Sequence, residues 1–194
     1  MKENYLEETA ICKNYKSENF KYNMLNVFAI ISFSLVLIWF VLCFNTLIYP
    51  EGHIISAIIT IIIPCVIFYL IGYLLMKFKY RFCVDYDYAL IEGSVRISKV
   101  IKNRRRFSLI NFEAKNVTKL GLVNSDDFIK VCSDKDIKVL FATSNNDPCE
   151  GKEFYYLITI SNGIKYIVVL ECTKKFLINL LAYCNKGVKD ASIK

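Results

Sequence analysis

Five cations gather within eight residues of the chain, and their spacing suggests a surface that binds anions. They are Lys99, Lys102, Arg104, Arg105 and Arg106. Planar guanidinium groups bind phosphate and carboxylate through two hydrogen bonds at once, and ammonium groups add compact positive charge. The cluster therefore predicts contact with anionic lipid headgroups or with an acidic segment of a partner. A solvated turn is the alternative that needs no ligand.

Few residues in the chain could catalyse a reaction. The single histidine is His53, and no nucleophile-elbow, HExxH, Walker, GxGxxG or kinase signature occurs. Asp85 and Asp87 are same-face neighbours on an expected strand, where a solvated edge explains both carboxylates. Asp126 and Asp127 suit the positive end of a helix better than a metal site. We therefore predict no enzyme activity, no cofactor, no metal site, no small-molecule substrate and no nucleic-acid partner.

Eight cysteines could form disulfides or bind zinc, but their arrangement favours neither. Cys43 and Cys65 fall inside long apolar segments, and no two cysteines form a CxxC pair. A lone histidine cannot complete a Cys/His zinc site of ordinary spacing. We expect the cysteines to be reduced, small, buried residues of a protein in a reducing compartment.

Two long apolar segments near the N-terminus dominate the organisation of the chain. Residues 24–48 and 54–76 are apolar runs, and Glu51 is the only formal charge between positions 22 and 76. As helices with about 1.5 Å of rise per residue, the runs reach roughly 37 and 34 Å, enough to cross a hydrocarbon core of about 30 Å. They predict a transmembrane hairpin with a linker at 49–53.

The distribution of cations predicts which side of the membrane holds the termini. Lysines and arginines flank the outer ends of the hairpin, whereas the linker 49–53 has none. The flanking residues are Lys13, Lys16, Lys21, Lys77, Lys79 and Arg81. By the positive-inside rule both termini are cytoplasmic, the linker is external, and the chain is a multi-pass protein of the cell membrane. The spans contain no ionisable Asp, Glu, Lys or Arg at membrane depth, so transport by the hairpin alone is not expected.

Residues 1–23 are predicted to be a short cytoplasmic segment before the membrane. Lys, Glu, Asn and Tyr alternate there without a clear period, which fits a frayed or interfacial segment, and the pattern indicates no function. The apolar run that follows is longer than the roughly 7 to 15 residues of a signal-peptide core. We therefore expect both helices in the mature protein.

After the second apolar run the hydrophobic period changes from helical to alternating, which predicts a mainly β domain at 80–186 and a tail at 187–194. Four strands are expected first, at 80–91, 95–101, 104–112 and 116–123. The basic cluster straddles the turn between the second and third of these strands. A hairpin tip is thus its expected position.

The second half of the domain begins with weaker signals. Residues 126–133 are either one short helix, which Ser125 would cap, or a long loop. Residues 138–142 are expected to form a short strand. The segment 143–152, rich in Ser, Asn and Asp, is expected to be a surface loop.

The last part of the chain contains the clearest local signals. Asn162-Gly163 separates two alternating segments, 154–161 and 164–171, and predicts a type I′ hairpin because both residues accept positive φ angles. Residues 173–185 carry apolar side chains at helical spacing and predict an amphipathic C-terminal helix.

Seven antiparallel strands, four and then three, followed by one amphipathic helix, are typical of the pleckstrin-homology-like fold. In that fold two curved sheets form a partly open barrel, and the helix closes one end. The predicted fold class is therefore an N-terminal α-helical transmembrane hairpin joined to a mainly β (α+β) domain. That domain is expected to be a seven-stranded, partly open barrel capped by the C-terminal helix.

Residues 86–106 carry a resemblance to a known family. Their sequence is YDYALIEGSVRISKVIKNRRR. It resembles the hairpin that begins the pleckstrin-homology-like domain of an uncharacterised group of two-span membrane proteins from clostridia and related Firmicutes. Val95 stands where leucine is usual there, and Ser98 where aspartate is usual. The resemblance implies the same topology and fold and assigns no catalytic residue.

The formal net charge of +7 is concentrated in the expected domain, because positions 77–194 hold 21 Lys and Arg against 13 Asp and Glu. A basic domain beside an anionic inner leaflet gains about 1 kcal/mol per well-placed cation. Phosphoinositide-binding members of the fold place cations around the first turn, here 92–94, so that kind of recognition is not expected.

We predict a non-enzymatic, membrane-anchored cytoplasmic module that interacts with the lipid bilayer and with a protein or peptide partner or a second copy of itself. The sequence leaves two alternatives open. One is a reader of anionic lipid surfaces that uses the basic cluster. The other is an accessory subunit of a larger membrane complex.

Overall fold

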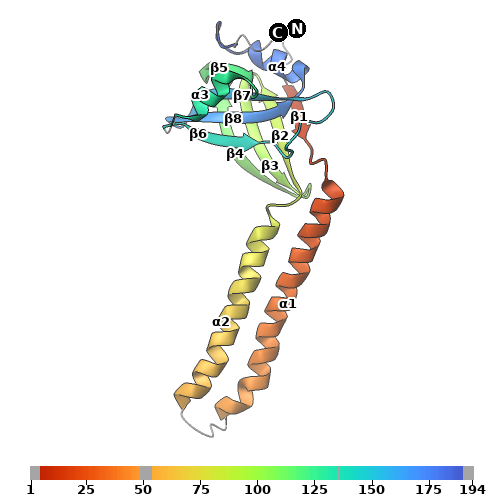
Figure 1. Cartoon of the computed structure of the whole chain (residues 1–194), viewed down its shortest axis with the longest axis vertical. Helices are drawn as coiled ribbons and strands as arrows, with labels where there is room; N and C mark the ends of the chain where they lie inside the picture. Colours follow the sequence, from red (N-terminus) through yellow and green to blue (C-terminus); the bar gives the residue numbers. More distant parts are fainter. Residues whose placement is uncertain (1–4, 49–53, 135, 190–194) are drawn as a thin grey trace. The chain divides into compact units, whose positions relative to one another are not determined.

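The structure, a computed structural model, describes residues 5–48, 54–134 and 136–189 (Figure 1). The predicted external linker at 49–53 lies outside these residues. Contacts divide the chain into two compact units, Met1–Lys13 with Val84–Lys194, and Asn14–Cys83. The first unit is therefore assembled from two stretches of sequence that the second unit interrupts.

The second unit consists of two helices, α1 (Tyr15–Ile48) and α2 (Ile54–Lys79), which lie side by side in opposite directions (Figure 1). Both are long and apolar enough to cross a membrane. Only 11% of the most apolar window of each helix is buried, whereas a core helix of a soluble protein is mostly buried. Helix α1 begins before the predicted apolar run because the polar residues 15–23 continue the helix.

Small side chains bring α1 and α2 close together. A Cβ atom at Gly72 would lie 2.9 Å from the ring of Phe33, so glycine permits this approach. The hydroxyl of Ser32 donates a hydrogen bond to the carbonyl oxygen of Phe68 (2.7 Å). Ser32 is therefore satisfied within the helix pair, as a polar group among apolar side chains must be.

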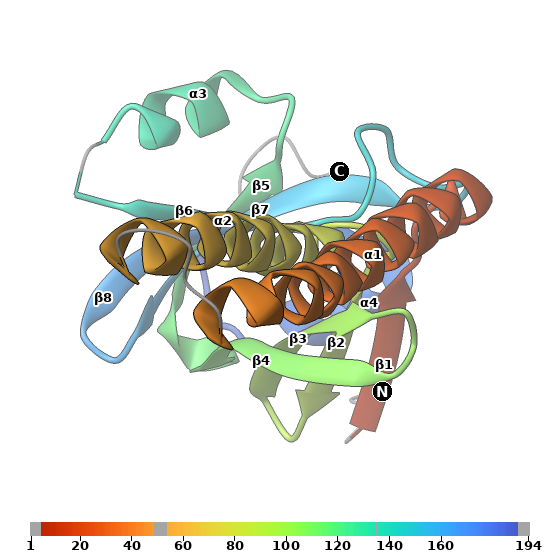
Figure 2. The same ribbon diagram turned by 90° about the horizontal axis from the view of Figure 1, so that it is seen from below.

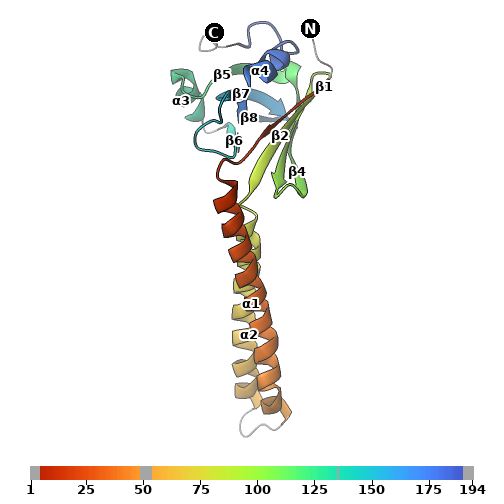
Figure 3. The same cartoon turned by 90° about the vertical axis from the view of Figure 1, so that its right-hand side faces the viewer.

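Four antiparallel strands form the first sheet, in the order β1-β2-β3-β4 (Figure 2). They are β1 (Tyr5–Ala10), β2 (Val84–Ile91), β3 (Ser94–Ile101) and β4 (Arg105–Glu113). Strand β1 lies beside β2 along its whole length (Figure 3), with a register that runs from Tyr5 opposite Ile91 to Ala10 opposite Tyr86. The connection between β1 and β2 is the entire helical hairpin.

Strand β1 corrects the prediction that residues 1–23 are a frayed or interfacial segment and that the domain begins at residue 80. The strand escaped prediction because Glu8 points to the same side as Leu6 and Ala10, which breaks the alternation of apolar and polar residues. Its partner strand is also remote in the sequence, as the separation of 78 positions from Thr9 to Asp87 shows. The strand is therefore stabilised by non-local pairing and not by local pattern.

The second sheet also has four strands, in the order β5-β7-β8-β6. They are β5 (Val117–Leu122), β6 (Lys138–Ala142), β7 (Glu153–Ser161) and β8 (Ile164–Cys172). The described residues thus form eight strands in two sheets and no closed barrel, where seven strands of one partly open barrel were predicted. Strand β6 also pairs in parallel with β8, although an antiparallel succession was expected.

Local signals in this half are confirmed. Helix α3 (Asp126–Cys132) begins at Ser125, whose hydroxyl accepts a hydrogen bond from the Phe128 amide. The β7–β8 turn has the predicted conformation, with φ of 51° at Asn162 and 76° at Gly163. A short 3₁₀ helix, η1 (Ala114–Asn116), joins the two sheets, and α4 (Lys174–Leu181) is the predicted C-terminal helix in a shorter form.

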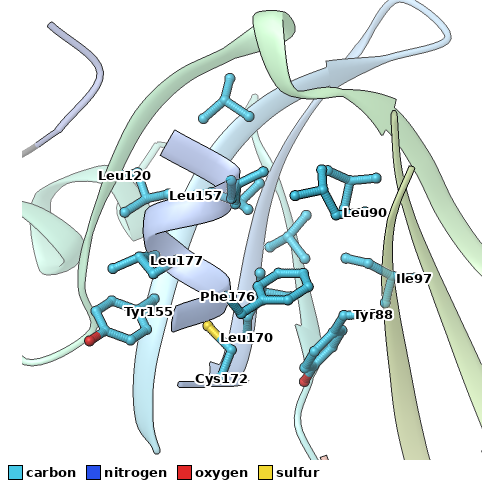
Figure 4. Packing of buried hydrophobic residues seen from close by; sticks show 14 of the residues in the cluster. Tyr88, Leu90, Ile97, Leu120, Tyr155, Leu157, Leu170, Cys172, Phe176 and Leu177 are labelled. Carbon is cyan, nitrogen blue, oxygen red and sulfur yellow. The ribbon is translucent and has the colours of Figure 1, made fainter. Parts of the chain in front are cut away.

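The main core lies between the inner faces of the two sheets and the apolar face of α4 (Figure 4). Phe176 of α4 is fully buried and points toward Tyr88 of β2, with ring centroids 6.0 Å apart. A smaller cluster, in which Phe128 of α3 packs near Tyr156 of β7, covers the other face of the second sheet. These two clusters stabilise both sheets, and the candidate functional residues lie on the strands and loops of these sheets.

Candidate functional site

The five predicted cations, Lys99, Lys102, Arg104, Arg105 and Arg106, lie at the turn end of the β3–β4 hairpin. We call this end of the hairpin the basic tip. The turn is tight, with φ of 51° at Lys102 and 53° at Asn103, and the Arg104 amide donates to the carbonyl oxygen of Ile101 (3.1 Å). Arg104, Arg105 and Arg106 are exposed, whereas Lys99 and Lys102 are half-buried. The hairpin therefore presents mainly guanidinium groups to the outside.

Arg106 differs from its neighbours because it faces a carboxylate. Its Nη2 lies 3.3 Å from Oδ2 of Asp87 in an ion pair whose arginine side chain is 70% exposed. Within the described residues Oδ2 accepts no well-directed hydrogen bond, so this contact is electrostatic. The other carboxylate oxygen of Asp87 accepts from the Thr9 hydroxyl (2.8 Å). The Asp87 carboxylate thus neutralises part of the positive charge of the basic tip.

Asp85 and Asp87 are buried, which corrects the prediction of a solvated edge. Their exposed fractions are 3% and 8%, because β1 covers the edge of β2. Oδ1 of Asp85 accepts a hydrogen bond from the Cys12 amide (2.8 Å). Burial raises the pKa of Asp85, the Cys12 amide opposes that rise, and the neighbouring Asp87 adds to it. The two carboxylates therefore hold the N-terminal strand in place.

Two apolar side chains accompany the arginines, and the sequence analysis did not single them out. Phe107 is 49% exposed and Leu109 is 36% exposed, both on β4 directly after the arginines. The β3–β4 register shifts between Ile97 and Ser98, so Leu109 has no register partner. Basic residues followed by exposed Phe and Leu are the signal that could have extended the predicted site.

The chain reaches the helices from the same end of the first sheet that carries the basic tip. Val84, the first residue of β2, is the register partner of Ile101, the last residue of β3 before the turn. Four residues separate α2 from β2, and four separate β1 from α1. Both connections are therefore short segments of the chain.

A second polar site surrounds Glu171, which is fully buried in β8. Its carboxylate accepts hydrogen bonds from the Cys149 amide (2.8 Å) and from the side-chain amide of Asn145 (3.0 Å). The Glu171 amide donates to the hydroxyl of Tyr88, which in turn donates to the carbonyl oxygen of Ala142. A carboxylate within the apolar run 167–172 of β8 was the sequence signal for this site.

Glu8 of β1 completes the second site from the other side. It accepts hydrogen bonds from the amide and hydroxyl of Thr173, both at 2.9 Å, and lies 3.2 Å from the ammonium group of Lys152. Lys152 also donates to the carbonyl oxygen of Thr9 (2.6 Å). The site therefore joins β1, the β6–β7 loop and the start of α4.

A family comparison fits this geometry. The model of the bacterial PH-like domain family (DUF6106) matches residues 8–190. The chain belongs to this family. The matched range begins inside β1 and ends beyond α4, so it includes both sheets and both apolar helices. No curated protein and no solved structure matches the chain.

Membership confirms the PH-like part of the predicted resemblance, while the clostridial origin and the two-span group stay predictions. Asp127, one of the two carboxylates considered for a metal site, forms an ion pair with Lys119 (2.6 Å). The side chain of the other, Asp126, lies outside the described part of the chain. Among the described residues no three His, Cys, Asp or Glu side chains converge as metal ligands.

Burial disfavours the reactive thiolate form of several cysteines in the PH-like domain. All eight cysteines of the chain are free, and Cys12, Cys83 and Cys172 are buried. Burial raises the pKa of Cys172 strongly and that of Cys184 to about 11. Burial also raises the pKa of Cys149, and its hydrogen bond to Glu171 adds to the rise. Raised values keep a thiol protonated and unreactive.

An open cavity of about 410 Å³ lies on the outer face of the second sheet. Its floor is apolar, with Phe141, Phe154 and Val169, and its rim is formed by hydroxyl and amide side chains at 143–146. No charged side chain lines it. The cavity thus combines an apolar floor with a polar, uncharged rim.

Proposed function

We propose that this protein is a non-enzymatic, membrane-anchored interaction module. Two helices cross the cell membrane, and the PH-like domain holds a protein or peptide partner, or a second copy of the chain, at the cytoplasmic face. The observation that carries the proposal is the pairing of β1 with β2 on either side of the helices. This pairing makes the helical hairpin an insertion within the PH-like domain. The membrane anchor is therefore an integral part of the domain and not an appended segment.

The same pairing supports the proposed topology. Six register pairs join β1, before α1, to β2, after α2, so both ends of the hairpin emerge on one side of the membrane. Two crossings satisfy this requirement, and one crossing does not. The lysines and arginines that flank the hairpin favour the cytoplasm for that side.

The exposed apolar surface supports insertion into lipid. Side chains such as Leu37 (69% exposed) and Ile62 (52% exposed) face outward along the helices. Apolar area of this extent is stable only against lipid or protein. Removal of α1 as a leader would also remove Thr9 of β1 and Cys12, which donate to Asp87 and Asp85.

Photo-crosslinking in living cells tests the partner role. A benzoylphenylalanine at Phe141 (61% exposed) or Ile178 (65% exposed) should give discrete protein adducts, and an adduct with a second 22.5 kDa chain would identify self-association. The same probe at Leu37 serves as the lipid-facing control. Protein adducts absent from both domain positions would contradict the proposal, and a large stoichiometric complex on native gels would favour the accessory-subunit alternative.

One observation favours a second candidate function, a reader of anionic lipid surfaces. The basic tip combines exposed Arg104 and Arg105 with exposed Phe107 and Leu109. Cations near an anionic leaflet gain about 1 kcal/mol each, and apolar side chains can enter the interface beside them. The turn that carries these residues lies at the end of the first sheet where β2 begins, four residues after α2 in the sequence.

Hydrogen exchange of the full chain in nanodiscs tests this second function. Amides of residues 103–109 should exchange more slowly in discs that contain phosphatidylglycerol than in neutral discs, and high salt should remove the difference. The Arg104→Glu/Arg105→Glu variant should lose the protection. Lys115→Glu/Lys186→Glu, with the same charge change beyond the far end of β4, should keep it. Equal exchange in both kinds of disc would exclude lipid reading by the tip.

A further inference from the structure

The chain stays fixed to the domain after β1 ends, over the residues that lead to the first helix. The side-chain amide of Asn145 donates to the carbonyl oxygen of Ile11 (2.9 Å), and its oxygen accepts from the Lys13 amide (2.9 Å). The ammonium group of Lys13 donates to the carbonyl oxygen of Pro148 (2.6 Å). Helix α1 begins two residues later, at Tyr15.

The same loop also covers the outer edge of β1. The Ser144 hydroxyl donates to the carbonyl oxygen of Ala10 (3.2 Å), and the Lys152 ammonium group donates to that of Thr9 (2.6 Å). An edge strand normally pairs with another strand or is covered in some other way. Here the cover consists of side-chain hydrogen bonds from residues 143–152, which are separate from the backbone pairing of the sheet.

Glu171 fixes this loop to the second sheet. It is fully buried, so its charge depends on donors, and two of them come from the loop: the Cys149 amide and the Asn145 side chain. Asn145 is therefore bonded both to the buried carboxylate and to the segment at 11–13. Cys149 of the same loop has both connections too, since its amide donates to Glu171 and its thiol to the carbonyl oxygen of Ile11 (3.8 Å).

We propose that the β6–β7 loop, residues 143–152, is a latch on the segment that enters the first membrane helix. When the latch is closed, residues 11–13 are a rigid continuation of β1. When it is open, residues 11–14 become a flexible tether between the domain and α1. Residues 143–146 also line the 410 Å³ cavity, so a molecule in that cavity touches the latch.

This inference rests on the proposed function, because a latch on residues 11–13 acts on a membrane anchor only if α1 is one. Different experimental results would refute the latch and the membrane anchor. A chain that fractionates as a soluble protein would remove the anchor and leave the latch geometry intact. A chain that inserts in the membrane but shows no cooperative release of residues 11–13 would remove the latch and leave the anchor.

Residue-resolved hydrogen exchange of the full chain in nanodiscs tests the latch. The matched variants are Asn145→Asp and Asn146→Asp, which make the same chemical change at adjacent positions that line the same cavity. Asp at 145 loses the donor to Ile11 and adds a negative charge beside Glu171. Asn146 is exposed, and no hydrogen bond joins it to residues 9–13 in the described part of the chain. Asn145→Ala provides a neutral second variant.

In both Asn145 variants the amides of Cys12 and Lys13 should exchange about tenfold faster, the factor expected for the loss of one ordinary hydrogen bond. Asn146→Asp should leave them unchanged, and slow amides of β7 and β8 should show that the fold persists. The Cys12 amide is the deciding probe, since it donates to Asp85 and not to Asn145. Faster exchange at Lys13 alone would overturn the latch, because it would show only the loss of one local bond.

Discussion

Excision of the helical hairpin should leave a folded, soluble PH-like domain, provided that β1 is kept. In the excised chain a short Gly/Ser linker joins Met1–Lys13 to Val84–Lys194. The two ends are already close, since the Cys12 amide lies 2.8 Å from Oδ1 of Asp85. A few linker residues, at about 3.3–3.6 Å each, therefore close the gap. The comparison is the truncated chain, residues 84–194, which lacks β1.

The structure indicates how much stability the truncated chain loses. Buried Asp85 and Asp87 each lose a donor, and a hydrogen bond to a charged group contributes about 1.5–3 kcal/mol. The two losses together amount to about 3–6 kcal/mol, before the lost pairing of β1 and the lost burial of Ala10 are added. Since a domain of this size is stable by about 5–15 kcal/mol, the truncated chain should be unfolded or nearly so.

Circular dichroism melting and the dispersion of amide resonances distinguish the two chains. The excised chain should melt cooperatively and give dispersed amide signals, while the truncated chain should show no cooperative transition. A truncated chain that melts at the same temperature as the excised chain would refute the assignment of β1 to the domain. It would also remove the main support for the proposed topology.

Two further predictions use the excised chain. Burial raises the pKa of Asp85 above its unfolded value, so the stability contributed by its protonated form is complete below the unfolded pKa and is lost as pH rises through the folded pKa. Asp85→Asn should therefore weaken the decline in melting temperature above pH 4, and an unchanged decline would contradict the role of this burial. Phe176→Ala should reduce the free energy of unfolding by about 3–5 kcal/mol, because the side chain is fully buried. Ile178→Ala on the same helix (65% exposed) should change it little, and equal effects in urea titrations would contradict the core described for α4.

The elements that the sequence predicts correctly are those whose signals are local. The β7–β8 turn follows from Asn162-Gly163 and the alternation on either side, and α3 follows from the Ser125 cap. The position of the basic cluster at a hairpin turn follows from the neighbouring strand patterns in the same way. Each of these signals lies within about ten residues of the element that it specifies.

The missed elements depend on partners that are distant in the sequence. Strand β1 is defined by β2, across the whole hairpin, and the burial of Asp85 and Asp87 follows from that pairing. Strand β6 was predicted in place, but a local pattern does not reveal that its partner is β8 or that the pair is parallel. The ion pair between Arg106 and Asp87 and the contacts of Asn145 are non-local in the same sense.

The central claim is that β1 and β2 meet on the cytoplasmic side of a membrane that the hairpin crosses twice. Epitope tags before Met1 and after Lys194, combined with protease added to spheroplasts or to inverted vesicles, measure this directly. Both tags should resist protease in intact spheroplasts and be digested in inverted vesicles. Digestion of one tag on each side, or of both tags in intact spheroplasts, would contradict the account.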